Sequence, residues 1–401
     1  MHTRLTQAEG VEQFPSLSPD GKWVVYSKDG DIFLQSATGQ TAINLTNNAQ
    51  ASNTMPAFSP DGELIAFRSA REGGGIFVMG RAGESVRRLT PNGFYPSWFP
   101  DGRQIIYSTE GPPGPESRLV FSELDVVSVA TGEPRRLVEG DAVQPRVSPH
   151  GRRIAYWAVP SDVATKRFVG SASGSNRDIW TVDASGRNPV RATTHDANDW
   201  NPVWSPDGAW LYFLSNRAGI MNLWRVPIDE TSGVTRGEPE ALTAPAQYVA
   251  HFTLSADGRT GAYASTSTTS NIGRIAFDSR TGAVTGSPTP VTTGTHDFVY
   301  MDVSPDARFV AATTSSRTRE DLYVVSAADG GLRQLTNDFA RDRAPRWAPD
   351  GRSIFFYSDR TVATRSGASR LTAAACDSSP LVPDATIQCR RAMDPGLRQS
   401  I

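Results

Sequence analysis

Three of the five histidines in this 401-residue sequence precede three consecutive copies of a repeated Ser-Pro-Asp-Gly-like motif. They are His195, His251 and His296. Imidazole nitrogens that converge within about 2.0 to 2.1 Å of one point are typical zinc ligands, so such a cluster could serve a metal-dependent enzyme. The histidines stand 10, 4 and 8 residues before their motifs, however, which places them at different heights. We therefore favour polar loop histidines over a metal site, and we expect no cofactor.

The same stretches of sequence carry other side chains suited to binding a ligand. Aromatic and polar groups that converge on a concavity are the usual composition of a binding site. We expect the three histidines to form one such site, at the mouth of a central channel, together with Tyr95, Asp199, Trp200, Asn201, Asp297 and Tyr300.

Two sets of repeated charged residues have structural explanations. The motif aspartates occupy one recurring turn position, where Asp is a favoured residue, so we interpret them as corner residues and not as a carboxylate array. They are Asp20, Asp61, Asp101, Asp207, Asp257, Asp306 and Asp350. An arginine also recurs at the end of the second strand of several repeats, where its long side chain could clamp the neighbouring third strand. These are Arg71, Arg217, Arg317 and Arg360.

Signatures of several enzyme classes are absent from the sequence. It has no Gly-x-Ser-x-Gly nucleophile elbow, which removes the hydrolase half of a prolyl oligopeptidase-like enzyme. It also has no P-loop, no Gly-rich nucleotide loop, and neither the His-Arg-Asp nor the Asp-Phe-Gly motif of protein kinases. We therefore expect a protein without catalytic activity.

The repeated motif predicts the turns and strands that must position these residues. In residues 205–208 the proline presets φ, Asp207 tolerates the next position and Gly208 supplies a left-handed residue, which predicts a tight β-hairpin corner. Runs of β-branched and aromatic residues flank the corner and indicate strands. Eight such corners occur, at residues 18–21, 59–62, 99–102, 148–151, 205–208, 255–258, 304–307 and 348–351.

A repeat of this length predicts a β-propeller. Successive corners lie 40 to 57 residues apart, which is room for four short strands. Because one such unit cannot bury both faces of its sheet, neighbouring units must stack. We expect an all-β propeller of four-stranded antiparallel blades, with eight blades or, if the last repeat does not form, seven. The residues directly before the corners should be buried between blades: Leu17, Phe58, Trp98, Val147, Trp204, Leu254, Val303 and Trp347.

Differences between blades should lie in the loops that join each fourth strand to the next first strand, because these loops crowd one mouth of the channel. The residues four positions before the corners form a mixed ring there: Phe14, Met55, Tyr95, Gln144, Asn201, His251, Tyr300 and Ala344. Two long excursions, residues 109–122 and 159–177, are expected on the rim of the same mouth.

Both ends of the sequence depart from the repeat. Residues 4–6 match the last strand of later repeats, so they either close the ring on the last blade or are the remnant of an upstream repeat. Residues 358–401 contain none of the 36 aromatic side chains. We expect a propeller over 1–357 and an atypical tail over 358–401 that is disordered or aberrant. Cys376 and Cys389 lie in this tail, where we expect neither a disulfide nor a metal site.

Charge and hydropathy exclude two classes of partner. The formal net charge of −2 gives no basic excess for nucleic acid or an anionic membrane surface. No window approaches the roughly 18 apolar residues of a membrane span, and the first residues lack the apolar core of a signal peptide. We expect a soluble monomer.

The repeats resemble the propeller repeats of the periplasmic TolB family from residue 4 to about residue 357. The resemblance lies in the Ser-Pro-Asp-Gly corners, in the strands that end in Trp-Ser or Phe-Ser, and in the Arg-Leu-Thr sequences that close the repeats. The repeats resemble even more the WD-like propellers that follow bacterial Ser/Thr protein kinases. The resemblance implies a β-propeller and a periplasmic or extracytoplasmic location. Such repeats serve as docking surfaces, sensor modules and peptidase gates.

We therefore predict a non-catalytic module that binds a protein or small ligand at the channel mouth. Two alternatives stay open. One is a metal-dependent lyase or hydrolase that uses His195, His251 and His296. The other is a propeller gate severed from a kinase or peptidase.

Overall fold

In a computed structural model, the chain folds into two compact units, Met1–Thr266 and Ser267–Ile401. The structure describes residues 5–6, 10–39, 41–47, 51–111, 121–159, 161–162, 167–168, 177–218, 221–242, 248–266, 269–315, 320–337, 341–358, 372–377 and 389–391.

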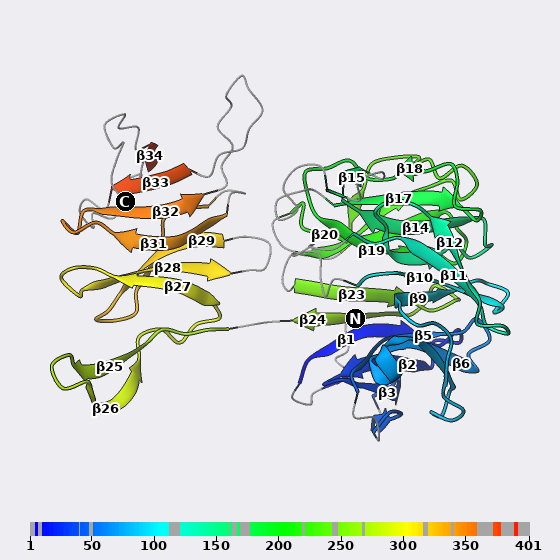
Figure 1. Ribbon diagram of the computed structural model, residues 1–401. Helices are drawn as coiled ribbons and strands as arrows, with labels where there is room; N and C mark the ends of the chain where they lie inside the picture. The colour runs from blue at the N-terminus through cyan, green and yellow to red at the C-terminus, as the bar shows by residue number, and fades with distance from the viewer. Residues whose placement is uncertain are drawn as a thin grey trace. The chain divides into compact units, whose positions relative to one another are not determined.

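The described part of the first unit contains five four-stranded antiparallel sheets (Figure 1). The strands of the first two are β1 (Glu12–Leu17), β2 (Trp23–Lys28), β3 (Asp31–Ser36), β4 (Ile43–Asn44), β5 (Asn53–Phe58), β6 (Leu64–Ser69), β7 (Gly75–Gly80) and β8 (Arg87–Arg88). Those of the third and fourth are β9 (Phe94–Trp98), β10 (Gln104–Ser108), β11 (Leu124–Ser128), β12 (Pro134–Val138), β13 (Val143–Val147), β14 (Arg153–Ala158), β17 (Asp178–Asp183) and β18 (Val190–Arg191).

The fifth sheet consists of β19 (Asp199–Trp204), β20 (Trp210–Ser215), β21 (Asn222–Pro227) and β22 (Glu240–Ala241). A hairpin of β23 (Tyr248–Leu254) and β24 (Gly261–Thr266) ends the unit. The remaining elements are the 3₁₀ turn η1 (Arg71–Gly73) and a small hairpin of β15 (Ser161–Asp162) and β16 (Arg167–Phe168), which lies inside the second predicted excursion. Residues 160, 163–166 and 169–176 of that excursion and residues 112–120 of the first lie outside the described residues.

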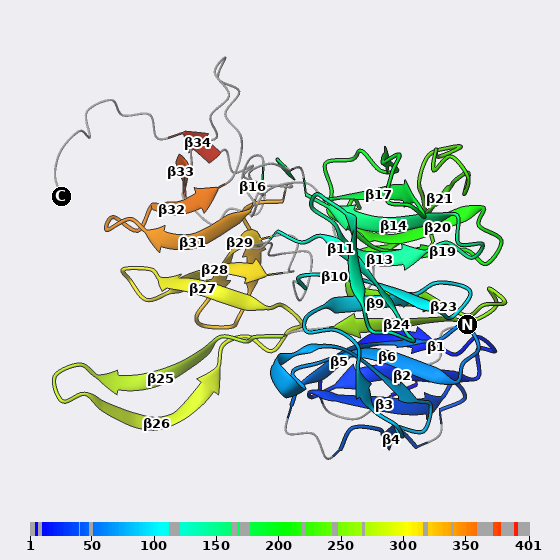
Figure 2. The same ribbon diagram turned by 45° about the vertical axis from the view of Figure 1, so that its right-hand side comes forward.

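The first strands of these sheets are neighbours in a closed cycle. β1 packs against β5, β5 against β9, β9 against β13, β13 against β19, and β19 against β23, which returns to β1. Figure 1 shows the green β23 and β24 beside the blue β1, and Figure 2 shows β9 near β13. Six inner strands therefore surround one axis within the first unit, and the prediction of an all-β propeller with four-stranded antiparallel blades is confirmed. The predicted total of eight or seven blades stays a prediction.

Short-range hydrogen bonds hold the Ser-Pro-Asp-Gly corners. Ser205 Oγ donates to Asp207 Oδ1 and accepts the backbone N–H of Trp210 at 2.8 Å, while Gly208 has a φ of 69°. The hydrogen bond from Ser205, followed by a backbone N–H, lowers the pKa of Asp207. The same Ser to Asp bond recurs at the corners that begin with Ser18, Ser59, Ser255 and Ser304. These bonds confirm that the aspartates are turn residues.

The predicted arginine clamp is also present where the chain is described. The guanidinium of Arg71 lies 5.6 Å from the ring centroid of Phe77, and that of Arg217 lies 5.1 Å from Trp224. Both rings belong to third strands, so each arginine packs against the third strand of its own sheet. Arg317 and Arg360 lie outside the described residues.

The second unit contains a hairpin and two four-stranded sheets among its described residues. The hairpin consists of β25 (Gly273–Asp278) and β26 (Ala283–Pro290). The sheets consist of β27 (Phe298–Val303), β28 (Phe309–Ser315), β29 (Glu320–Ser326) and β30 (Leu332–Gln334), then β31 (Asp342–Trp347), β32 (Ser353–Ser358), β33 (Thr372–Asp377) and β34 (Cys389–Arg391). β33 and β34 lie in the tail, so described tail residues extend the last sheet, and a domain boundary at residue 357 stays a prediction.

Burial of the residues before the corners agrees with the repeat alignment in the first unit. Leu17, Phe58, Trp98 and Trp204 are all buried. Val147, Leu254 and Trp347 are only half-buried and Val303 is 55% exposed, so the expectation that every such residue is buried is wrong at these four positions.

Residues 4–6 were predicted to close the ring, and no membrane span was predicted. Arg4 lies outside the described residues, while the carbonyl of Leu5 accepts a hydrogen bond from Gln35 Nε2 at 3.0 Å. The closure of the ring by residues 4–6 therefore stays a prediction. No helix of sufficient length and apolar character to cross a membrane occurs in the part of the chain that the structure describes.

Candidate functional site

A β-bulge interrupts each inner strand of the first unit, four residues before the corner in five of them and at Ala250, five residues before the corner, in β23. In five of these strands the bulge residue has a left-handed φ between 51° and 55° and a proline follows it. Non-glycine residues adopt this conformation rarely, so its repetition marks a built feature of the fold. The five residues are Phe14, Met55, Tyr95, Gln144 and Asn201, and His251 takes the equivalent place in β23 without a following proline.

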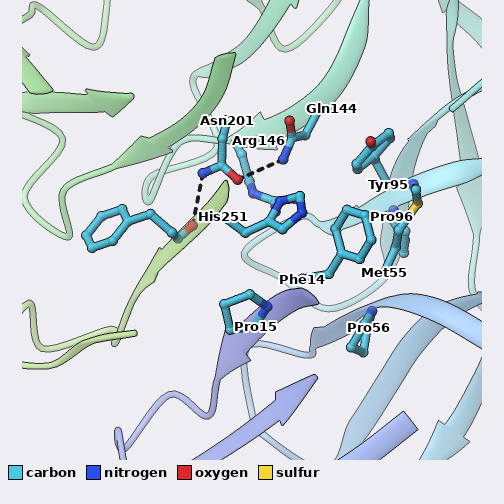
Figure 3. Close-up of a pocket in the computed structure, with 11 residues that line it drawn as sticks. Phe14, Pro15, Met55, Pro56, Tyr95, Pro96, Gln144, Arg146, Asn201 and His251 are labelled. Atoms are coloured by element: carbon cyan, nitrogen blue, oxygen red, sulfur yellow. Dashed lines mark hydrogen bonds between the residues drawn. The ribbon is translucent and has the colours of Figure 1, made fainter. Parts of the chain in front are cut away.

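The five bulge residues and His251 line one pocket (Figure 3). Its cavity volume is about 10 Å³, which is room for about one water molecule. Its lining consists of Phe14, Pro15, Met55, Pro56, Tyr95, Pro96, Gln144, Arg146, Asn201, His251 and Phe252. The ring predicted from the four-residue offset is therefore real for all six of its members in the first unit.

A chain of hydrogen bonds fixes the polar side of the pocket. Trp157 Nε1 donates to Gln144 Oε1 at 3.2 Å, and Gln144 Nε2 donates to Asn201 Oδ1 at 2.9 Å. Asn201 Nδ2 then donates to the carbonyl oxygen of Phe252 at 3.0 Å, as the dashed lines of Figure 3 show for the last two bonds. Because both amides are buried and satisfied, their orientation is determined by the network.

His251 is a buried, neutral imidazole. Its side chain is 2% exposed, and its ring lies 4.0 Å from the ring centroid of Phe14 and 5.1 Å from that of Trp200. Burial, with a smaller contribution from the positive charge of Arg146, lowers the pKa of His251 to about 3. Among the described residues, its Nδ1 atom is buried without a hydrogen-bond partner.

Arg146 is the charged member of the pocket lining. Its guanidinium donates to the carbonyl of Pro145 at 3.3 Å, and no ion pair joins it to a described carboxylate. Burial lowers its pKa to about 10, so Arg146 stays a cation at neutral pH. Figure 3 shows its side chain next to the His251 ring, in agreement with the effect of its charge on His251.

The structure brings together some of the predicted site residues of the first unit. Tyr95, Asn201 and His251 line the pocket, and Trp200 is buried behind His251. Asp199 is fully buried and pairs with Arg217 at 2.7 Å, in the interior of its sheet. His195 is exposed in a bend.

The other predicted residues belong to the second unit. His296 packs on Phe298 and Tyr323, with ring centroids 5.6 and 5.3 Å away. Asp297 accepts a hydrogen bond from Ser270 at 2.6 Å, and Tyr300 is 50% exposed. That His296, Asp297 and Tyr300 share a pocket with Tyr95 stays a prediction.

The described residues contain no preformed metal-binding site. No three His, Cys, Asp or Glu side chains there are grouped so that they could hold an ion. Arg146 beside His251 would also repel a cation at that imidazole.

Sequence reasoning missed Arg146, which stands two residues after the bulge at Gln144. Gln144 and Arg146 both line the pocket, as residues two apart share a face of a regular strand, and the signal for the position in the sequence is the repeated residue-proline pair. A search for an arginine after such a pair would have found Arg146.

Residues 24–265 match the family described as the Tricorn protease N-terminal beta propeller domain. The chain belongs to this family. The match covers well over half of the sequence and lies within the first unit.

Two curated relatives and one solved structure are similar to this chain. An uncharacterized protein of Agrobacterium fabrum is 26% identical over 54% of this chain and 70% of its own length. The Tol-Pal system protein TolB of Francisella tularensis subsp. mediasiatica is 27% identical over 45% of this chain and 54% of its own length, so the match spans about half of that protein. The solved structure of a putative TolB from Agrobacterium tumefaciens has a TM-score of 0.48 at 23% identity, covering 60% of this chain and 83% of that chain. The family match and the TolB relative show that the chain is a TolB-like β-propeller.

Proposed function

We propose that this propeller is a non-catalytic binding module and that its ligand binds over the pocket at the bulges of the inner strands. The observation that carries the proposal is the convergence of five bulge residues and His251 on one pocket, in which His251 Nδ1 is buried and unpartnered within the described residues. A buried polar atom without a partner is costly, and a ligand that bonds to it removes that cost. The family match and the TolB relatives support an interaction module in general terms.

The proposal also explains the position of the strained backbone residues. Left-handed non-glycine residues are costly and persist where the surrounding structure holds them. Five of them turn their side chains to the same pocket, while the strand ends away from it carry ordinary hairpin corners. The strain therefore shapes one concave surface.

A ligand screen tests the proposal. Purified protein is examined by thermal shift against a panel of small metabolites and short synthetic peptides, and compounds that raise the melting temperature are recovered and analysed by mass spectrometry. We expect compounds that bind, that are recovered unchanged, and that no longer bind to a variant with Tyr95→Phe and His251→Phe. The phenylalanine at position 251 keeps the packing against Phe14 and Trp200.

Two results would overturn the proposal. Chemical conversion of a bound compound by wild type, abolished by the same variant, would make the pocket an active site. Equal binding to wild type and variant for every compound would place the ligand elsewhere on the propeller.

A further inference from the structure

We propose that Asp178 and Asp199 are a proton-binding pair, which tightens the contact between the fourth and fifth sheets of the first unit as the pH falls. Asp178 begins β17 of the fourth sheet, and Asp199 begins β19 of the fifth. Both residues are almost fully buried. The backbone N–H of Asp199 donates to the carbonyl of Arg177 at 2.8 Å, so the two aspartates are neighbours across the junction of the sheets.

A second place in the same unit has the same architecture with an asparagine instead of Asp199. Asn53 and Asp199 both stand six residues before the serine of a corner, and both begin an inner strand. Each is held by a clamp arginine, since Arg71 Nη2 donates to Asn53 Oδ1 at 3.2 Å and Arg217 Nη2 donates to Asp199 Oδ2 at 2.7 Å. The other oxygen, Asp199 Oδ1, therefore corresponds to the amide nitrogen of Asn53.

These two corresponding atoms differ in their hydrogen bonds. Asn53 Nδ2 donates to the backbone carbonyls of Ala51 at 2.8 Å and Gly30 at 3.3 Å. Asp199 Oδ1 is buried without a hydrogen-bond partner in the described part of the chain. The carbonyl of Arg177 accepts the Asp199 N–H just as that of Gly30 accepts the Asn53 N–H, so an acceptor replaces a donor beside it. An unpaired buried acceptor is costly, and a proton on the carboxyl group supplies the missing donor.

The electrostatics of the pair favour the same proton. Burial raises the pKa of Asp178 to about 6, and the negative charge of Asp199 adds to this effect, while hydrogen bonds from Arg191 and Thr193 oppose it. Because the two carboxyl groups interact, the proton belongs to the pair and not to one residue. Other charged or titratable side chains on the surrounding elements are Asp141, Arg177, His195, Asp196 and Arg217.

The raised pKa of Asp178 fixes the direction of the pH effect. The folded protein takes up the proton below about pH 6, whereas an unfolded chain does so only near the ordinary aspartate pKa of about 3.9. Between these values protonation favours the folded state, and the gain is lost as the pH rises through about 6. Because β19 also carries Asn201, the proton stabilises a strand that contributes to the pocket lining.

Matched exchanges at the two equivalent places test the inference. Asp199→Asn restores the donor, and Asn53→Asp creates the unpaired acceptor at the other place. Thermal unfolding midpoints of the full chain are measured between pH 5 and pH 8. We expect Asp199→Asn to raise the midpoint at pH 8 and to bring less benefit at pH 5. Asn53→Asp should lower the midpoint more at pH 8 than at pH 5.

A titration of the wild type needs no variant to fold. Carboxyl carbon resonances of protein labelled at aspartate are followed by NMR over the same pH range, and we expect a buried carboxyl group that titrates with a midpoint near pH 6. Two results would overturn the inference. One is an Asp199→Asn midpoint that is lowered equally at pH 5 and pH 8, which would mean that the charge of Asp199 is needed beside Arg217. The other is the absence of any aspartate signal that titrates above pH 5.

Discussion

Gln144 and Asn201 hold each other in one orientation across two neighbouring inner strands, with Gln144 Nε2 donating to Asn201 Oδ1 at 2.9 Å. Trp157 Nε1 donates to Gln144 Oε1, which orients the amide so that its nitrogen faces Asn201. Asn201 must then turn its own nitrogen toward the carbonyl of Phe252. This chain of hydrogen bonds thus connects β13, β19 and β23 and forms the polar side of the pocket.

Asn201→Asp should break this chain. The substitution puts a carboxylate oxygen against the Phe252 carbonyl, so a buried acceptor loses its donor, which costs about 1 to 3 kcal/mol. Urea denaturation measures the free energy of unfolding, and Asn92→Asp at an exposed asparagine is the control. Equal stabilities of the two variants would show that the network contributes nothing.

Trp204 should connect two blades by both packing and a hydrogen bond. Its indole is 7% exposed, and its Nε1 donates to the backbone carbonyl of Arg146 at 3.1 Å. Trp204→Phe should therefore cost about 1 kcal/mol for the lost bond, and Trp204→Ala about 3 to 5 kcal/mol for the cavity. An unchanged unfolding midpoint for Trp204→Ala would mean that the strand register is wrong.

Arg217→Met should destabilise the protein far more than Arg225→Met. Both arginines lie over a tryptophan and bind a carboxylate, but Arg217 and its partner Asp199 are buried, with side chains 8% and 0% exposed. Removal of one member of a buried pair costs about 3 to 5 kcal/mol. The pair of Arg225 and Glu240 is 32% and 49% exposed, where ion pairs contribute about 0 to 1 kcal/mol. Comparable losses in chemical denaturation would contradict a structural role for Asp199.

His251 should make stability depend on pH with a known sign. Its pKa is about 3 in the folded protein and ordinarily about 6.5, so between these values only the unfolded chain binds the proton. The free energy of unfolding should therefore fall by about 1.4 kcal/mol per pH unit as pH decreases below 6.5. The difference between wild type and His251→Phe isolates this contribution from that of other groups. A difference that does not change between pH 7 and pH 4 would mean that His251 is not buried; His195→Phe, at an exposed histidine, is the control.

Much of the fold followed from the sequence because its corners are local. The prolines, aspartates and glycines of the corners fix the turns by short-range bonds, such as the one from Ser205 to Asp207, which do not depend on distant parts of the chain. The same offset from the corners placed Tyr95, Asn201 and His251 in one pocket. Turns that are fixed by neighbouring residues, and positions at a constant offset from those turns, can be predicted from a single sequence.

The role of other residues depends on contacts that no local pattern contains. Asp199 looked like a ligand-binding residue because its loop is rich in polar groups, but its partner Arg217 is 18 residues away along the chain and lies across the neighbouring strand. Arg146 was overlooked because only the residue four positions before each corner was considered, although residues two apart in a strand share a face. The cycle from β23 back to β1 joins residues more than 200 positions apart, which a repeat period alone does not specify.

The most direct test of a ligand site at the inner-strand bulges uses the five histidines as reporters. Imidazole nitrogen and proton resonances of selectively labelled protein are recorded by NMR while a compound that raises the melting temperature in the thermal-shift panel is added. The account predicts that the signals of His251, assigned by their loss in His251→Phe, shift in a saturable manner, while those of the exposed His195 stay in place. Saturable shifts at His195 or His150 with unchanged His251 signals would contradict it.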